Sequence, residues 1–177
     1  MPKVSQQHLD ARRQQIVDAA RARFASHGFA GTSMTDIIAE SGLSNGAIYR
    51  YFTSKEQIIA AVCEQNTDAF PQALTETAIS EFLEHVRTMA REKGHARLTA
   101  QIMAEAALSP ALAAIVQQQL AAHRQAVTAL LPGVPERDAQ QTAEAFVAIC
   151  GGYNQQLAVR GDVDPAPFTA ALLAVLG

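Results

Sequence analysis

Residues 31–56 read GTSMTDIIAESGLSNGAIYRYFTSKE, and this stretch decides the fold. It predicts two short helices separated by a tight turn. Ser33 can cap the first helix while the carboxylate of Asp36, three residues on, reaches back to the Ser33 N–H, a variant of the capping box. That helix ends where Gly42 turns the chain as a left-handed C-cap. Ser44 then caps the second helix, which runs through the two tyrosines.

Two short helices joined by a glycine-containing turn form a helix-turn-helix, here over residues 33–52, and the second helix of such a unit can enter the major groove of DNA. The second helix begins with residues 45–47, which are small enough to approach base edges closely. Ile48 and Phe52 are expected to face inward and to lock the unit onto the first helix. The motif therefore predicts a DNA-binding surface.

Phenols and a cation lie on the other faces of the same segment. The rings of Tyr49 and Tyr51 can be buried while their OH groups reach phosphate oxygens. Ser54 is expected to cap the next helix, where the Lys55 ammonium and free backbone N–H groups would converge on an anion. Each residue also has an ordinary alternative, such as a packed tyrosine, a solvated lysine or a salt-bridged Arg50. The combination favours contact with nucleic acid.

Residues 9–60 resemble the DNA-binding domain of the tetracycline-repressor (TetR) family of bacterial transcription factors. The resemblance rests on Ile16 to Phe24, Gly28, Thr32-Ser33-Met34, Asp36-Ile37, Gly42-Leu43-Ser44, Gly46-Ala47-Ile48-Tyr49, Tyr51-Phe52 and Ser54-Lys55-Glu56. It implies phosphate contacts by Thr32, Ser33, Ser44, Tyr49 and Lys55. It implies contacts to bases or adjacent backbone by Asn45, Ala47, Arg50 and Tyr51, with Gly46 allowing close approach. Asn45 departs from the family pattern, since many members carry lysine or arginine there.

The totals place the chain among globular proteins. It has 177 residues, of which 49% are hydrophobic and 18% charged. No apolar run approaches the roughly 20 residues that span a bilayer, and the first residues lack the apolar core of a secretory signal, so a cytoplasmic protein without a membrane segment is expected. Cys63 and Cys150 lie in apolar helical patterns and are expected to be buried free thiols, with a redox pair as the alternative.

Charge is distributed unevenly along the chain. The net charge is −3, but residues 1–60 carry seven lysines and arginines against five acidic residues, a net charge of +2. Residues 61–177 carry the balance of −5. The basic N-terminal segment, residues 1–60, is compatible with phosphate contacts, although the charge asymmetry alone is weak support for DNA binding.

The apolar residues repeat with the helical period of 3.6 throughout, which predicts an all-α protein of about nine helices. No alternating strand pattern occurs. We expect residues 1–55 to form a three-helix, helix-turn-helix DNA-binding domain. Residues 56–177 are expected to form a helical domain, and the family resemblance implies that it binds an effector and makes a homodimer.

The late helix contains two adjacent glycines, Gly151 and Gly152, which weaken a helix by about 1 kcal/mol each relative to alanine. A second copy of the chain packing closely against it in a four-helix bundle explains them. A close crossing within one chain and a kink beside a pocket are the alternatives. The residues predicted for the dimer interface are Ala143, Val147, Gly151, Phe168 and Leu172.

An effector pocket is expected where polar or aromatic residues interrupt apolar stripes. His123 lies on the stripe of Val116, Leu120 and Val127, although a lone histidine there is more often part of the core. The residues predicted to contact the effector are Phe70, His85, Met89, Met103, His123, Cys150, Tyr153 and Asn154, with Gln101 as a further candidate. Tyr153 and Asn154 could equally serve the dimer interface, and the methionines could fill the core.

The leading hypothesis is a homodimeric repressor that a small-molecule effector releases from a palindromic DNA operator. No metal-binding spacing, phosphate-binding loop or nucleophile motif occurs, so we expect no enzyme activity, no cofactor and no metal. A ligand-responsive activator and a helical protein-interaction module are the alternatives.

Overall fold

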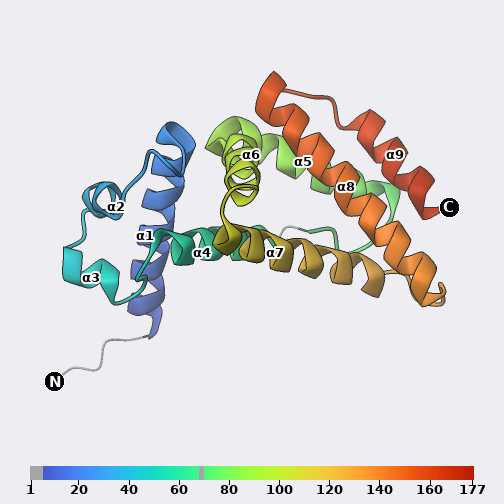
Figure 1. Cartoon of the computed structure of the whole chain (residues 1–177). Helices are drawn as coiled ribbons and strands as arrows, with labels where there is room; N and C mark the ends of the chain where they lie inside the picture. The colour runs from blue at the N-terminus through green and yellow to red at the C-terminus, as the bar shows by residue number, and fades with distance from the viewer. Residues whose placement is uncertain (1–5, 68–69) are drawn as a thin grey trace. The chain divides into compact units, whose positions relative to one another are not determined.

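The structure is a computed structural model that describes residues 6–67 and 70–177. The all-α prediction is confirmed, because those residues form nine helices and no strand (Figure 1). They divide into two compact units, one ending at Glu64 and the other beginning at Gln65. Across the two described ranges, none of the helices combines the length and the apolar character that crossing a membrane requires.

The first unit consists of α1 (Gln6–His27), α2 (Met34–Ser41), α3 (Asn45–Tyr49) and most of α4 (Lys55–Thr67). Its core is apolar and takes residues from each of these helices. The buried residues are Ile16, Val17, Ala20, Phe24, Phe29, Ile37, Ile48, Phe52, Ile58, Ile59 and Val62. Since α3 has five residues and isolated helices shorter than about 12 residues are marginal in water, this packing holds α3 in place.

The second unit consists of α5 (Glu76–Lys93), α6 (His95–Ala106), α7 (Pro110–Ala129), α8 (Glu136–Arg160) and α9 (Ala166–Leu176). Helix α8 is central and contacts α5, α6, α7 and α9. Its partner α9 is the red helix that lies beside it in Figure 1. The buried core is built around Ile79, Leu83, Val127, Phe146, Leu157 and Leu172.

The division between the two compact units falls inside helix α4. The prediction puts the boundary between residues 55 and 56, at the start of α4. The two compact units divide nine residues later, between Glu64 and Gln65, so that α4 begins in the first unit and ends in the second. A continuous helix gives no composition change at the point of division, which is why the sequence places the boundary at the helix start.

Two polar ties fix the C-terminal end of the second unit. Arg87 of α5 makes a two-pronged ion pair with Asp162, the Nη2–Oδ2 distance being 2.8 Å. The hydrogen bond from Arg87 holds the pKa of the Asp162 carboxyl below its usual value. The Tyr153 hydroxyl donates to the Val163 carbonyl at 3.2 Å. Together they anchor the link between α8 and α9.

Candidate nucleic-acid interface

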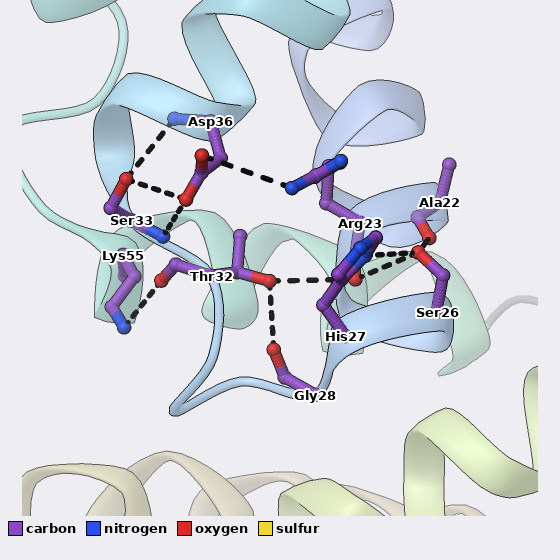
Figure 2. Close-up of polar contacts among 9 residues, drawn as sticks. All are labelled: Ala22, Arg23, Ser26, His27, Gly28, Thr32, Ser33, Asp36 and Lys55. Atoms are coloured by element: carbon purple, nitrogen blue, oxygen red, sulfur yellow. Dashed lines mark hydrogen bonds and ion pairs between the residues drawn. The ribbon is translucent and has the colours of Figure 1, made fainter.

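The amino end of α2 is closed by the capping box that the sequence predicts (Figure 2). The Asp36 N–H donates to Ser33 Oγ at 3.1 Å, and Asp36 Oδ2 accepts from the Ser33 N–H at 2.7 Å and from the Ser33 hydroxyl at 2.6 Å. The hydrogen bonds from the Ser33 hydroxyl and backbone hold the pKa of the Asp36 carboxyl below its usual value. At the other end Gly42 has φ of +66°, which ends α2 as predicted.

The turn between α1 and α2 is closed by internal hydrogen bonds. Thr32 is 1% exposed, and its hydroxyl donates to the Gly28 carbonyl at 2.7 Å (Figure 2). A Cβ at Gly31 would lie 2.4 Å from the His27 carbonyl oxygen, so this position needs glycine. No sequence pattern predicts this role for Gly31, because the backbone that it approaches is fixed only in the folded turn. The expectation that Thr32 reaches phosphate is corrected, since its side chain is buried.

Lys55, the first residue of α4, reaches back to the same turn. Its Nζ donates to the Phe29 carbonyl at 2.9 Å and to the Thr32 carbonyl at 2.7 Å. It also lies 4.3 Å from the centroid of the Phe29 ring. The expected capping of α4 by Ser54 is present, with the Gln57 N–H donating to Ser54 Oγ at 3.4 Å.

Helix α3 presents its polar residues outward and its apolar residues inward. Ile48 is fully buried, and Phe52, just after the helix, is almost so. Ser44, Asn45, Gly46 and Arg50 are exposed, Tyr49 is 47% exposed, and Ala47 and Tyr51 are half-buried. This division agrees with the inward positions expected for Ile48 and Phe52. Leu43, in the turn before the helix, is half-buried.

Ser44 occupies the N-cap position of α3 without using its side chain there. Its carbonyl accepts from the N–H groups of Ala47 at 3.0 Å and Ile48 at 3.2 Å, whereas its hydroxyl makes no capping bond. A Cβ added at Gly46 would meet nothing within 4 Å. Glycine is therefore not required there by the chain itself, and the space beside α3 is open to another molecule.

Part of the predicted effector set gathers in the core of the second unit, where Phe70 and Tyr153 are buried and Cys150 packs against them. Phe70 and His123 stack with ring centroids 4.7 Å apart, and burial lowers the pKa of His123. Tyr153 is fully buried, and burial raises the pKa of the Cys150 thiol to about 12. Met89 is half-buried, whereas His85 and Met103 are exposed. The Oδ1 atom of Asn154 on α8 and the Oε1 atom of Gln101 on α6 are buried without hydrogen-bond partners.

A cleft of about 340 Å³ opens in the second unit where α5 ends and α6 begins. It is lined by Ala90, Arg91, Gly94, Ala96, Arg97, Leu157 and Gly161. None of the predicted effector residues lines it. The two arginines make its rim basic, a feature that apolar periodicity could not reveal.

The structure corrects part of the predicted dimer interface. Ala143 and Leu172 are fully buried within the chain, and Val147 is 8% exposed, so these side chains offer little or no surface to a second copy. Phe168 is half-buried, and its ring lies 4.7 Å from that of Tyr153. Gly151 is exposed and a Cβ there would meet nothing within 4 Å. Gly151 thus lies on the exposed face of α8, whereas Ala143 and Val147 lie on its buried side.

Residues 16–62 match the family described as bacterial regulatory proteins, tetR family. The HTH-type transcriptional repressor Rv1474c of Mycobacterium tuberculosis is 40% identical over 68 residues, which are 38% of this chain and 36% of that protein. The uncharacterized HTH-type transcriptional regulator YfiR of Bacillus subtilis is 38% identical over 77 residues, 44% of this chain and 38% of that protein. The chain thus spans less than two fifths of these relatives. The HTH-type transcriptional regulator UidR of Escherichia coli is 29% identical over 138 residues, 75% of this chain and 68% of that protein.

Solved structures share the fold over almost the whole chain. Salmonella enterica GusR superposes with a TM-score of 0.76 at 23% identity, covering 99% of both chains. A TetR transcription regulator from Haloarcula marismortui superposes with a TM-score of 0.71 at 16% identity, covering 94% of this chain and 96% of that one. The family match falls on α1 to α4, where the capping box, the glycine turn and the outward residues of α3 lie. Residues 16–62 therefore belong to the tetR family of bacterial regulatory proteins, and the whole chain shares the fold of the solved structures.

Proposed function

We propose that the chain is a transcriptional regulator that binds double-stranded DNA through α3. The observation that carries the proposal is the division of α3 into two sides. One side is buried, with Ile48 at its centre, and the other is exposed to solvent and bears polar groups. Small residues at the start of such a helix let it approach base edges in the major groove. Family membership and relatives named as HTH-type regulators support the same function.

The residues proposed to contact DNA are those with exposed groups. Ser44 and Tyr49 would bind phosphate oxygens, and Asn45 and Arg50 would reach base edges or adjacent backbone. Ala47 and Tyr51 are half-buried and would add contacts beside them. The Ser33 hydroxyl donates a hydrogen bond to Asp36, so a hydrogen bond from Ser33 to phosphate would replace it. The Thr32 side chain is buried, so it is not among the proposed DNA contacts.

The regulator is proposed to act as a homodimer on a palindromic operator, since two recognition helices must reach half-sites about 34 Å apart. The exposed side of α8 supports this arrangement. A Cβ added at Gly151 or Gly152 would meet nothing within 4 Å, so a close crossing within the chain does not explain these glycines. Val159, on the same helix, is 81% exposed. A second copy packing on α8 would use both features.

Release by a small-molecule effector is proposed from the buried amides of the second unit. Gln101 Oε1 and Asn154 Oδ1 lie on α6 and α8, which pack together, and neither oxygen has a partner. Buried polar groups are normally satisfied, so unpartnered ones favour a ligand that donates hydrogen bonds. A ligand that binds the DNA-free conformation roughly 10²- to 10⁴-fold better would release the operator by a shift of populations.

The sign of regulation is proposed to be repression, as in the relatives named transcriptional repressors. The protein would act in the cytoplasm, where the operator is, and regulation of this kind needs neither catalysis nor a cofactor. The test is fluorescence anisotropy of the full chain with DNA from upstream of its own gene, against a scrambled duplex. Specific binding that weakens steeply with salt is expected. Equal binding to both duplexes, or none to either, would refute the function and favour a protein-interaction module.

A further inference from the structure

The first residue of α3 carries an amide that the fold itself does not use. Asn45 is exposed, and among residues 6–67 and 70–177 no hydrogen bond or ion pair involves its side chain. The N-cap of α3 is Ser44, whose carbonyl accepts from the N–H groups of Ala47 and Ile48, so helix capping does not occupy the Asn45 amide either. An asparagine amide offers one acceptor oxygen and two N–H donors. These groups are available to another molecule.

The next residue leaves the backbone beside this amide uncovered. Gly46 lies inside α3, where glycine weakens a helix relative to alanine. A Cβ added there would meet nothing within 4 Å, and the backbone of Gly46 is not left-handed, so the fold does not require glycine at this position. A missing side chain does serve a molecule that comes close to the backbone of α3. Because a single methylene joins the Asn45 amide to its backbone, the amide reaches a base edge only through such a close approach.

The four bases differ in what they offer to an amide in the major groove. Adenine presents the N7 acceptor beside the N6 amino donor, so one amide can donate to N7 and accept from N6 at the same time. Guanine presents two acceptors, N7 and O6, and the amide oxygen would face another oxygen there. Cytosine offers only a donor, and thymine offers an acceptor beside a methyl group. An amide at this place in α3 therefore discriminates in favour of adenine.

We propose that Asn45 is the residue by which α3 recognises an adenine in the operator, through paired hydrogen bonds to N7 and N6, with Gly46 giving the clearance that the short side chain needs. This inference rests on the proposed function of DNA binding and adds the identity of one base to it. The preferred A·T pair should be bound roughly 5- to 150-fold better than another pair at that position, which is the discrimination of a bidentate contact.

The first measurement selects duplexes from a random library with the full chain and with variants of Asn45. The wild-type chain should select adenine at a position where Asn45→Ala accepts any base. Asn45→Gln keeps the amide and should still select adenine, whereas Asn45→Lys should select guanine, because an ammonium donates to N7 and O6. The other positions of the selected sequence should stay the same. An unaltered sequence in Asn45→Ala or in Asn45→Lys would overturn the proposal.

The second measurement removes one acceptor from the DNA. In the selected duplex the adenine is replaced by 7-deazaadenine, which has a C–H in place of N7 and still pairs with thymine. Wild-type affinity, measured by fluorescence anisotropy, should fall about two- to tenfold, as for one lost hydrogen bond. Asn45→Ala has no amide to lose and should bind both duplexes equally. The same replacement at an adenine outside the selected sequence is the control and should leave both affinities unchanged. Equal losses in the wild-type chain and in Asn45→Ala would contradict the contact.

Gly46→Ala tests the close approach. Its urea midpoint should equal or exceed that of the wild-type chain, since the new Cβ meets nothing within 4 Å and alanine favours helix. Its operator affinity should fall about tenfold or more, because the added methyl group lies between α3 and the base edges. Wild-type affinity in this variant would overturn the proposal. If the wild-type chain selects no sequence, the proposed function fails. If it selects one that the Asn45 variants share, DNA binding stands and only the role of Asn45 is wrong.

Discussion

Ser33 and Asp36 bond each other reciprocally across the first turn of α2. The side chain of each residue accepts from the backbone N–H of the other, at 3.1 Å for Ser33 Oγ and 2.7 Å for Asp36 Oδ2. The Arg23 guanidinium lies 3.8 Å from the same carboxylate and links the cap to α1. The start of α2 is therefore fixed both to its own first turn and to its neighbour.

Ser33→Ala removes the hydroxyl from this cap. We expect the free energy of unfolding of the first unit to fall by about 1 kcal/mol, the usual cost of losing an N-cap side chain. Urea denaturation followed by circular dichroism measures it. Ser44→Ala is the matched control: Ser44 is also an N-cap, but its hydroxyl makes no capping bond, so stability should be unchanged. Equal losses in both variants would contradict the cap assignment.

Tyr49→Phe removes one exposed hydroxyl from the end of α3. If that OH donates to a phosphate, operator affinity should fall about tenfold, because hydrogen bonds to charged groups contribute about 1.5–3 kcal/mol. Anisotropy titration at fixed salt measures the change, and the urea midpoint should stay at the wild-type value. An affinity within error of wild type would remove Tyr49 from the DNA contacts.

Tyr153 should make the second unit sensitive to alkaline pH. Burial raises the pKa of its phenol to about 12, against about 10 in the unfolded chain. Between these two pKa values the unfolded state releases a proton that the folded state keeps. The contribution of Tyr153 to the free energy of unfolding is therefore fully present below about pH 10. It is lost as the pH rises from about 10 to about 12. Phenolate absorbance should show one late-ionising tyrosine, absent in Tyr153→Phe. A variant that retains the late step would assign it elsewhere.

Gly151→Glu tests the exposed side of α8. A Cβ at this position meets nothing within 4 Å, and glutamate favours helix over glycine by about 0.5–1 kcal/mol, so the single chain should fold normally. A buried carboxylate at a dimer interface should convert dimers to monomers in sedimentation velocity. Leu108→Glu, at an exposed position after α6, is the control and should leave the assembly unaltered. A Gly151→Glu variant that still dimerises would place the interface elsewhere.

Asn154→Leu separates a ligand contact from a structural amide. Because the Asn154 Oδ1 atom has no partner, replacing the amide by an apolar group should preserve or raise the unfolding temperature. Thr169→Val is the control, since the buried Thr169 hydroxyl accepts from Ser80 at 3.5 Å and its loss should lower stability. Operator binding should survive in Asn154→Leu while release by effector is lost. A clear drop in stability would show that Asn154 serves the fold.

Features that depend on near neighbours in the chain are those that the sequence predicts well. The Ser33–Asp36 cap and the turn at Gly42 are decided within ten residues, so local chemistry suffices for them. The burial of Thr32 and the partners of Lys55 depend on segments that only folding brings together, and both residues were expected at DNA. The side of α8 that is buried depends on how four other helices pack around it. The small residues of the late helix therefore predict Ala143 at an interface, whereas packing places it in the core.

The brevity of α3 has a consequence for how the protein responds to heat. Five residues cannot stay helical without the packing of Ile48 and Phe52 on the rest of the first unit. DNA recognition by α3 is thus lost when that unit melts cooperatively. A substitution anywhere in its core, at Phe24 for example, should lower the temperature at which the operator is vacated, without altering which sequence is read below it.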